Sequence, residues 1–380
     1  MANTSIYEDI AARTGGDIYI GVVGPVRSGK STFIKQFMDK LVMPNIAEEY
    51  SKERAKDELP QASSGRTIMT TEPKFIPEKG VKINIDNAAS MNVRLIDCVG
   101  YIVPSALGYI ENDQPRMVKT PWFEEPIPFN MAAEIGTKKV ITEHSTIGLV
   151  ITTDGSISDI PREEYEEAEA RVIDELKAIN KPFIVLYNCL EPENEQSCAT
   201  ANALALKYGV PVIAVNCLEI DESTIKDILS QMLYEFPVRE ISVNFPKWIN
   251  ALPANHWLKD SLFDDIKAAA NGIYKIRDIN GFAEEFDTNE LTDGAKLNGI
   301  SLGQGSADIS LRIKPDLFYK VLTQTTGLEI YDEQQLMNNI IELSKIKTQY
   351  MRVKDALDEV EATGYGIVMP TIEELSLEEP

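Results

Sequence analysis

The chain has 380 residues, enough for roughly two or three domains, and its 43% hydrophobic and 26% charged residues are typical of a soluble globular protein. A net charge of −23 at pH 7 argues against nucleic acid or anionic lipid as a partner, although the acidity could also serve solubility alone. Neither a membrane-spanning run, nor a secretory signal, nor a closely spaced cysteine pair is found, which favours a cytosolic protein with reduced thiols.

A phosphate-binding loop is predicted near the N-terminus. Residues 1–16 form a short polar lead-in, and residues 18–23 read as a buried strand. An amphipathic helix is predicted from Lys30 onward. The segment between them fits the P-loop pattern G-x-x-x-x-G-K-[ST]. It reads Gly24-Pro25-Val26-Arg27-Ser28-Gly29-Lys30-Ser31-Thr32.

Each fixed position of this motif has a chemical reason. Gly24 and Gly29 let the backbone curl so that successive N–H groups face a phosphate, and the helix dipole adds positive potential. Lys30 is expected to bridge the β- and γ-phosphates, and Ser31 to bind Mg²⁺. The sequence therefore predicts a Mg²⁺-nucleoside triphosphate site.

The next segments match the positions of nucleotide-dependent switches. Residues 44–66 are polar and charged, and they read as a loop or exposed helix. The stretch that follows contains Thr70 and Thr71, and either hydroxyl could complete the Mg²⁺ shell and sense the γ-phosphate. The alternative is two ordinary threonines that enter a strand.

A second motif supports the first. Residues 81–86 and 92–97 alternate as strands, and the latter ends in a D-x-x-G sequence from Asp97 to Gly100. Asp97 can hold a Mg²⁺-bound water, and the Gly100 amide can meet the γ-phosphate. Asp and Gly are also common turn residues, so the motif is strong only because it follows a strand and a P-loop.

Residues 101–145 are predicted to be long and irregular, because prolines interrupt every regular pattern. We interpret this segment as a mobile second switch and a candidate partner surface. Strands at 146–154, 183–188 and 210–215 then alternate with helices at 161–179, 196–208 and 221–235. This rhythm predicts an α/β fold, with a mostly parallel sheet that carries helices on both faces and binds nucleotide beyond the carboxyl ends of its strands.

The pattern changes after Pro237, so we predict a P-loop NTPase domain over 1–237 and a smaller α+β middle domain over 238–380. The middle domain should contain helical segments over 248–279, a turn-rich stretch over 294–305, a strand at 309–313 and a helix at 315–326. A long amphipathic helix is predicted over 332–362. Its apolar stripe favours packing within the chain over a self-assembly face. The stripe consists of Leu336, Ile340, Leu343, Ile346, Tyr350, Val353 and Leu357.

Two departures from the GTPase pattern affect the chemistry. Where GTPases read guanine with N-K-x-D, this chain has Asn188-Cys189-Leu190-Glu191, and the loop near 215–217 lacks the usual base-contact residues. Adenine is therefore the better expectation, with Asn188 still a nucleotide-site residue. Tyr101 stands where a water-orienting glutamine often follows D-x-x-G, which predicts slow hydrolysis.

Four segments together closely resemble the stage IV sporulation protein A family, a spore coat morphogenetic ATPase and P-loop NTPase related to translation-factor-type GTPases. The resemblance covers the whole chain. It is carried by the P-loop residues 24–32, the threonine-rich segment 67–75, the Arg94-to-Tyr101 segment and the Pro/Trp-rich segment after it.

The resemblance implies an ATP hydrolase that polymerises into the static basement layer of the spore coat, on the outer forespore surface in the mother-cell cytoplasm. In the family the P-loop Lys, the strand-end Asp and the sensor Thr are functional; here they match Lys30, Asp97 and Thr70 or Thr71. It further implies ATP and Mg²⁺ as cofactors, with Ser31, Thr70 and Asp97 as metal-site residues.

Partners are also implied by the resemblance: other copies of the chain, a small amphipathic forespore-membrane anchor peptide, and further coat morphogenetic proteins. Membrane contact would be indirect. The resemblance also implies a further C-terminal domain in family members, which is expected to be absent here, since the chain stops in an acidic stretch that reads like a cut between domains.

Two other functions stay open from the residues alone. One is a regulatory GTPase switch, and the other is a nucleotide-binding scaffold with negligible turnover. No arginine finger stands out among Arg27, Arg54, Arg66 and Arg116.

Overall fold

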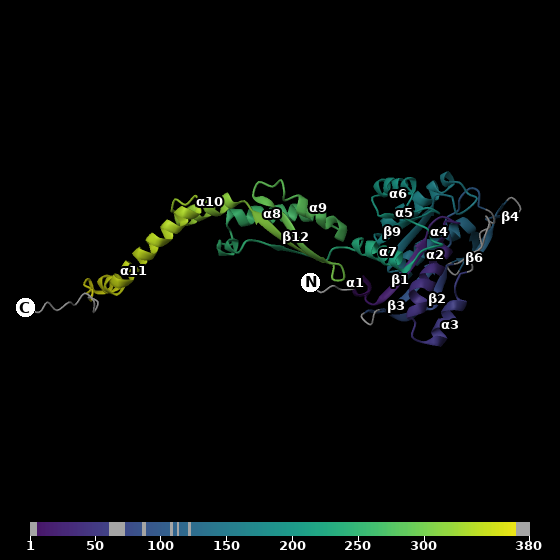
Figure 1. The fold of residues 1–380 in the computed structure, drawn as a ribbon, viewed down its shortest axis with the longest axis horizontal. Coiled ribbons are helices and arrows are strands. Elements are labelled where there is room, and N and C mark those ends of the chain that lie inside the picture. The colour runs from purple at the N-terminus through teal and green to yellow at the C-terminus, as the bar shows by residue number, and fades with distance from the viewer. Residues whose placement is uncertain are drawn as a thin grey trace, which may run out of the picture. The chain divides into compact units, whose positions relative to one another are not determined.

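The computed structural model describes residues 6–60, 73–85, 89–106, 109–111, 114–120 and 123–369 (Figure 1). The chain forms two compact units. The first contains Met1–Asn244, Asp264–Ala283 and Leu297–Ile309, and the second contains Phe245–Phe263, Glu284–Lys296 and Ser310–Pro380. Residues 297–309 belong to the first unit, where the Gly303 amide donates to Asp9 at 3.1 Å. In the same unit Arg13 donates to the carbonyl of Pro237, the last residue before the predicted domain boundary.

The predicted mostly parallel sheet is confirmed. Within the described residues it has six strands in the order β10-β9-β8-β1-β3-β2, and only β2 runs antiparallel to its neighbour. Every residue of β8 and β9 is buried, as expected for strands covered on both faces. The strands are β1 (Asp17–Val23), β2 (Lys74–Ile85), β3 (Ala89–Asp97), β8 (Ile147–Thr153), β9 (Phe183–Asn188) and β10 (Val212–Val215).

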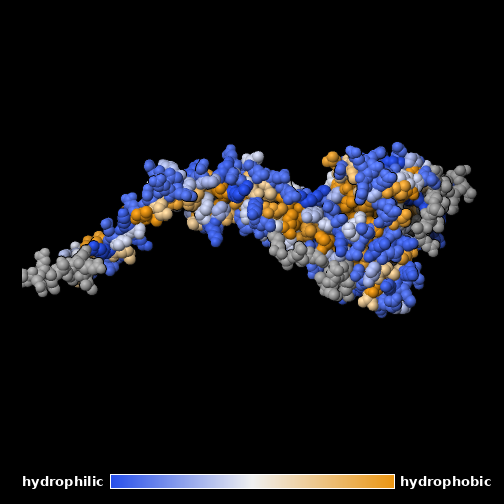
Figure 2. Space-filling view, viewed as in Figure 1, coloured by the Kyte–Doolittle hydropathy of each residue, from blue (hydrophilic) through white to orange (hydrophobic). Residues whose placement is uncertain are grey.

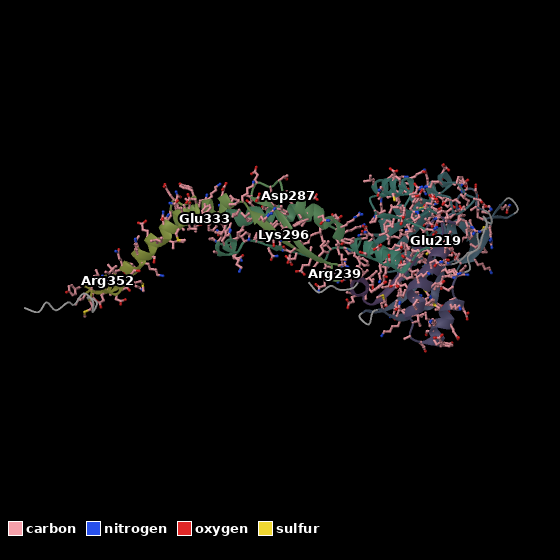
Figure 3. All side chains as sticks on the ribbon, viewed as in Figure 1. Glu219, Arg239, Asp287, Lys296, Glu333 and Arg352 are labelled. Atoms are coloured by element: carbon pink, nitrogen blue, oxygen red, sulfur yellow. The ribbon has the colours of Figure 1, made fainter. Side chains whose placement is uncertain are left out.

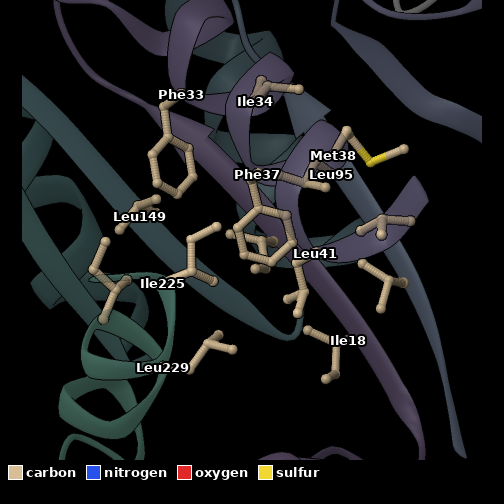
Figure 4. Close-up of a cluster of buried hydrophobic side chains, with 14 of the residues drawn as sticks. Ile18, Phe33, Ile34, Phe37, Met38, Leu41, Leu95, Leu149, Ile225 and Leu229 are labelled. Atoms are coloured by element: carbon tan, nitrogen blue, oxygen red, sulfur yellow. The ribbon is translucent and has the colours of Figure 1, made fainter. Parts of the chain in front are cut away.

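Helices cover both faces of this sheet, also as predicted. One face packs against α1 (Ile6–Thr14), α2 (Lys30–Phe37) and α7 (Glu222–Tyr234). Figure 4 shows Phe33 and Phe37 of α2 beside Leu149 of β8 and Ile225 of α7. The other face packs against α4 (Phe129–Lys139), α5 (Glu166–Ile179) and α6 (Glu195–Tyr208). A hydrophobic core lies on each face of the sheet, and alternate residues of β1, β3 and β8 contribute to one core or the other.

The prediction that 101–145 is irregular throughout was wrong. The segment contains β4 (Ile110–Glu111), β5 (Gln114–Pro115), β6 (Met117–Thr120), β7 (Phe123–Pro128), the helix α4 and a π-helical turn at Val140–His144. Small residues carry much of the buried face of α4, including Ala132, Ala133 and Gly136, and these give little hydrophobic contrast in the sequence. The mobility expected of this segment stays a prediction.

The region after residue 237 contains a three-stranded sheet, ordered β11 (Glu240–Asn244), β13 (Ser306–Ile313) and β12 (Thr292–Ser301). The turn-rich prediction for 294–305 was wrong for most of its length, because β12 continues through its glycines. The turn itself is confined to 302–305. β11 was not predicted; its alternating exposed and half-buried residues give a weak strand signal.

The remaining helices are close to prediction. They are α3 (Glu49–Asp57), α8 (Trp257–Ala270), α9 (Ile279–Glu284), α10 (Pro315–Thr326) and α11 (Glu333–Thr363), with a short 3₁₀ helix at Lys247–Ala251. Ile249, Leu258, Leu262 and Val321 form the core of the second unit. Among the described residues, no helix is both long and apolar enough to cross a membrane.

The predicted packing of the α11 stripe within the chain was wrong. The helix forms as expected: the Asp332 side chain accepts from the Gln335 amide at its start, and Gly364 ends it in the left-handed conformation. However, most of its large apolar side chains are about half exposed, and of the stripe only Leu336 and Val353 are partly buried. Figure 2 shows apolar side chains on the surface of this helix.

Candidate nucleotide-binding site

The loop between β1 and α2 has a backbone that only glycine permits at two positions. Gly24 has φ +140°, and a Cβ there would lie 2.1 Å from the Ile151 carbonyl oxygen. Gly29 has φ +98°, and its Cβ would lie 2.2 Å from Asn188 Nδ2. Both positions combine positive φ with close packing, so the two fixed glycines of the motif are explained by the fold as well as by phosphate access.

Lys30 is held inside this loop. Its ammonium donates to the Pro25 carbonyl at 2.7 Å and to the Gly24 carbonyl at 3.3 Å. Burial lowers the pKa of Lys30 to about 8, and the nearby Asp97 carboxylate partly opposes that change. A buried cation that donates to backbone carbonyls is well suited to exchange them for phosphate oxygens.

Ser31 and Asp97 form a pair of hard oxygen ligands. The Ser31 hydroxyl donates to Asp97 Oδ2 at 2.7 Å, and Asp97 is 2% exposed at the carboxyl end of β3. Burial raises the pKa of Asp97, while the charge of Lys30 and the Ser31 hydrogen bond oppose the rise. These two oxygens fit Mg²⁺ in chemistry and spacing. Within the described residues, no group of three His, Cys, Asp or Glu side chains is placed to hold a metal ion.

The D-x-x-G segment is joined to the P-loop by its backbone. The Tyr101 amide donates to the Gly24 carbonyl at 3.1 Å, and the Val26 amide donates to the Tyr101 carbonyl at 2.8 Å. A Cβ at Gly100 would lie 2.6 Å from both the Lys30 Nζ and the Val26 amide nitrogen. The structure therefore brings Gly100 against the lysine of the P-loop, while the contact of its amide with a γ-phosphate stays a prediction.

Tyr101 itself has a structural contact that the sequence did not reveal. Its side chain is buried, and its hydroxyl donates to Glu175 of α5 at 2.6 Å. Burial raises the pKa of Tyr101, and the hydrogen bond to Glu175 raises it further. The side chain thus anchors the D-x-x-G segment to α5 and is engaged away from the phosphate-binding loop.

Asn188, at the end of β9, joins two loops of the site. Its Nδ2 donates to the Ser28 carbonyl at 3.0 Å, and its Oδ1 accepts from the Cys217 amide at 3.0 Å. The side chain is buried, so both backbone groups depend on it. Asn188 therefore positions the P-loop relative to the loop after β10.

The two loops beside Asn188 expose leucines. Leu190 and Leu218 are 54% and 63% exposed, and Asn216 connects their loops by donating to the Leu190 carbonyl at 3.3 Å. Cys189, which is buried, occupies the lysine position of the N-K-x-D motif, and Leu190 occupies the variable position after it. The lysine that would pack on a guanine ring is therefore absent.

Two further P-loop residues are notable. The Ser28 hydroxyl is buried and has no hydrogen-bond partner in the part of the chain that the structure describes, which leaves one donor for an anion. Arg27 adopts a left-handed conformation with φ +63°, and burial lowers its pKa despite the nearby Tyr165. Both observations fit a loop shaped to receive a phosphate.

A buried ionic network at the end of β8 was missed by sequence reasoning. Glu169 of α5 is fully buried and receives two hydrogen bonds from Arg162, at 2.6 and 2.8 Å. Thr152 and Tyr208 also donate to it, at 2.5 and 2.9 Å. In the sequence Glu169 lies in an acidic stretch that reads as a solvated helix start, so only the fold reveals its burial. The network fixes the β8 end beside the P-loop.

The remaining predicted residues are placed as follows. Thr70 and Thr71, and also Arg66, lie outside the described residues. Arg54 pairs with Glu58 at 3.6 Å within α3. Arg116 lies between β5 and β6. Thr32 follows Ser31 in the first turn of α2.

Comparison with known proteins supports the same reading. The family model "Stage IV sporulation protein A, ATPase domain" matches residues 1–237, and the model of the middle domain matches residues 238–380. Proteins named stage IV sporulation protein A from Clostridioides difficile (strain 630) and Bacillus subtilis (strain 168) are 50% and 48% identical to the chain. Each alignment covers 100% of this chain and 77% of the relative.

Proposed function

The chain belongs to the stage IV sporulation protein A family, and from this premise we propose that it binds and slowly hydrolyses Mg²⁺-ATP to drive its own assembly into a static layer of the spore coat. The family assignment makes it a sporulation protein with an ATPase domain that binds nucleotide.

One observation carries the proposed catalytic role: Lys30, Ser31 and Asp97 meet at the carboxyl edge of the sheet. Ser31 and Asp97 already share a 2.7 Å hydrogen bond, and Lys30 is buried in the adjoining loop. When bound, Mg²⁺ would neutralise charge on the triphosphate. Ser31 and Asp97 would hold that ion, Lys30 would bind phosphate oxygens, and the Gly100 amide would orient them.

Adenine is the proposed base because the guanine-reading residues are absent. Glu191 stands at the aspartate position of N-K-x-D, and it accepts a hydrogen bond from Asn194 at 3.1 Å in the turn before α6. Leu190 offers an apolar contact that favours neither purine. Asn188 retains a positioning role that is independent of the base.

The assembly and its setting follow from the family resemblance. We place the layer on the outer forespore surface, in the mother-cell cytoplasm, with a small amphipathic membrane peptide and other coat morphogenetic proteins as partners. Indirect membrane attachment agrees with the net charge of −23, which would disfavour direct adsorption to anionic lipid.

The test measures phosphate release and sedimentation in the same samples, with ATP or GTP. We expect ATP-selective turnover and ATP-dependent pelleting, both lost in Lys30→Ala and in Asp97→Ala. A Lys181→Ala variant serves as control, since Lys181 binds backbone carbonyls at the opposite edge of the sheet. GTP-selective turnover with soluble protein would refute the proposal and favour a regulatory GTPase switch.

One observation favours a second candidate, a nucleotide-binding scaffold with negligible turnover. The Tyr101 side chain is engaged by Glu175, so no group in the glutamine position is available to orient water. Turnover that stays at the uncatalysed rate in wild type, together with ATP-dependent pelleting, would support this scaffold.

A further inference from the structure

Tyr101, the residue directly after the D-x-x-G segment, is bonded both to the P-loop and to a helix. Its backbone forms a parallel bridge with Pro25. The Tyr101 amide donates to the Gly24 carbonyl at 3.1 Å, and its carbonyl accepts from the Val26 amide at 2.8 Å. The side chain is 4% exposed, and its hydroxyl donates to Glu175 of α5 at 2.6 Å. One residue thus connects the phosphate-binding loop to α5.

The carboxylate that accepts this bond is partly shielded from solvent. Charged side chains such as Glu219, Glu333 and Arg352 are exposed and extend away from the ribbon (Figure 3). The Glu175 side chain is 31% exposed, and Arg171 of the same helix lies 3.5 Å from its other oxygen. A hydroxyl that donates to a carboxylate forms a short, charge-assisted hydrogen bond, which is stronger than a neutral one. Glu175 is therefore a firm anchor for the tyrosine.

The residues on either side of Tyr101 are also bonded to helical elements. The buried Thr137 hydroxyl of α4 donates to the Val99 carbonyl at 3.1 Å. Further along, the Ser105 amide and hydroxyl both donate to Glu164, in the turn before α5, at 2.6 Å each. Residues 99–105 are therefore held by α4 and the α5 region as well as by the P-loop.

Gly100 lies between two of these anchored residues, Val99 and Tyr101. A Cβ at Gly100 would lie 2.6 Å from Lys30 Nζ, so its backbone is packed against the ammonium group. Its amide is the group expected to meet the γ-phosphate. Glycine has more accessible backbone conformations than any other residue, so the direction of this amide depends on the residues beside it.

We propose that Tyr101 is a positioning residue, which through its hydrogen bond to Glu175 holds the Gly100 amide in place for the terminal phosphate of ATP. The inference deepens the proposed ATP binding and rests on it. It gives the residue at the glutamine position a role of its own, separate from the orientation of water. The Tyr101 side chain acts through the backbone of its neighbour, because it is engaged away from the phosphate-binding loop.

The proposal predicts a difference between ATP and ADP. Without the anchor, the Gly100 amide is in place in only a fraction of the molecules, and the apparent affinity for ATP falls by that fraction. ADP has no terminal phosphate, so its affinity does not depend on this amide. A change in the ratio of the two affinities therefore reports on the position of Gly100, whereas a general loss of folded protein would lower both alike.

Titration with ribose-labelled fluorescent ATP and ADP measures this ratio. Tyr101→Phe keeps the buried ring and removes only the hydroxyl, so we expect about fivefold weaker ATP binding, the worth of a typical hydrogen bond, with ADP binding unchanged. Tyr109→Phe is the matched control, because the Tyr109 hydroxyl donates to the Pro104 carbonyl in the same segment but outside the anchor. A wild-type ratio in Tyr101→Phe would overturn the proposal.

Variants of the acceptor test the same bond from its other end. Glu175→Gln keeps an oxygen that can accept from the tyrosine hydroxyl, so it should retain most of the preference for ATP. Glu175→Ala removes the acceptor and should lose as much of that preference as Tyr101→Phe. Full preference for ATP in Glu175→Ala would contradict the proposal.

Hydrogen exchange of the nucleotide-free protein tests the anchor without any ligand. The Tyr101 and Val26 amides both donate within the described chain, so their exchange reports how often this bridge opens. Both amides should exchange about fivefold faster in Tyr101→Phe than in wild type, and at the wild-type rate in Tyr109→Phe. Equal exchange in wild type and Tyr101→Phe would overturn the proposal.

Tyr101→Gln separates the anchor from a role in orienting water. Glutamine is too short to reach Glu175 from the same backbone position, although it restores the residue that GTPases often have. We expect the KM for ATP to rise and kcat not to rise. Faster turnover with an unchanged KM would show that this position serves water alone, and would overturn the inference.

The outcomes also separate this inference from the proposed function. If turnover stays at the uncatalysed rate but Tyr101→Phe weakens ATP binding and leaves ADP binding unchanged, the ATPase fails and the positioning role stands. If Lys30→Ala abolishes turnover and pelleting while Tyr101→Phe keeps the wild-type affinity ratio, the proposed function stands and this inference fails.

Discussion

The nucleotide-binding edge of the sheet and helix α11 differ in how far their side chains are buried. At the sheet edge Lys30, Asp97 and Asn188 are all buried, and each is hydrogen-bonded by the chain itself. Along α11 the apolar side chains are close to half exposed. The first region is preorganised to act on a small ligand, whereas the second leaves an apolar face half exposed in the part of the chain that the structure describes.

The largest expected effect is a loss of stability when the buried ion pair between Arg162 and Glu169 is broken. Arg162→Ala would leave Glu169 charged, fully buried and without its cation, which should lower the free energy of unfolding by about 3–5 kcal/mol. Arg171→Ala is the control, because its pairs with Glu134 and Glu175 lie near the surface and should cost less than about 1 kcal/mol. Equal urea midpoints for the two variants would contradict this account.

The next largest effect is expected when the Asn188 side chain, which joins the P-loop to the loop after β10, is removed. Asn188→Ala would leave the Ser28 carbonyl and the Cys217 amide without their hydrogen-bond partner. This should lower the free energy of unfolding by about 1–3 kcal/mol for each buried group. Nucleotide affinity should also fall, because the P-loop loses its support. Asn194→Ala removes an exposed helix cap and should cost only about 1 kcal/mol without changing affinity. Fluorescent-nucleotide titration measures the affinity, and urea unfolding measures the stability. Unchanged affinity in Asn188→Ala would contradict a role of Asn188 in supporting the P-loop.

Through Lys30, protein stability and nucleotide affinity should depend on pH in opposite directions. Its pKa of about 8 in the folded protein lies below the ordinary 10.5, so between these values the unfolded chain binds more protons, and the contribution of Lys30 to stability rises with pH. Nucleotide binding needs the charged form, so affinity should fall above pH 8, by up to about tenfold per pH unit. Lys30→Arg should flatten that profile, because arginine stays charged. A flat wild-type profile between pH 7.5 and 9.5 would contradict the low pKa.

The smallest expected effect lies on α11. Ile346→Ala should change the free energy of unfolding of dilute protein by less than about 0.5 kcal/mol, because the side chain is 52% exposed in the part of the chain that the structure describes. Ile225→Ala, in the core between α7 and the sheet, should cost about 2–5 kcal/mol. A large loss in Ile346→Ala would show that the chain itself covers the stripe.

Much of the first unit could be predicted from sequence because its signals are local. The P-loop, the D-x-x-G segment and the alternation of strands and helices each depend on residues close together in the chain. They gave the parallel sheet, and they brought Lys30, Ser31 and Asp97 to one edge, since parallel strands end at the same side. The glycine-containing strand β12 and the small-residue helix α4 were missed because hydrophobic contrast is weak in both.

The sequence by itself determined the nucleotide-binding loop, the layered α/β fold and the existence of a long amphipathic α11. Only the tertiary structure decided which polar side chains are buried and which apolar ones are not. Asn188, Tyr101 and Glu169 acquire their roles from residues 29 to 160 positions away in the chain or on another element. Periodicity shows that one face of α11 is apolar, but whether that face is covered depends on what packs against it, which no local pattern records.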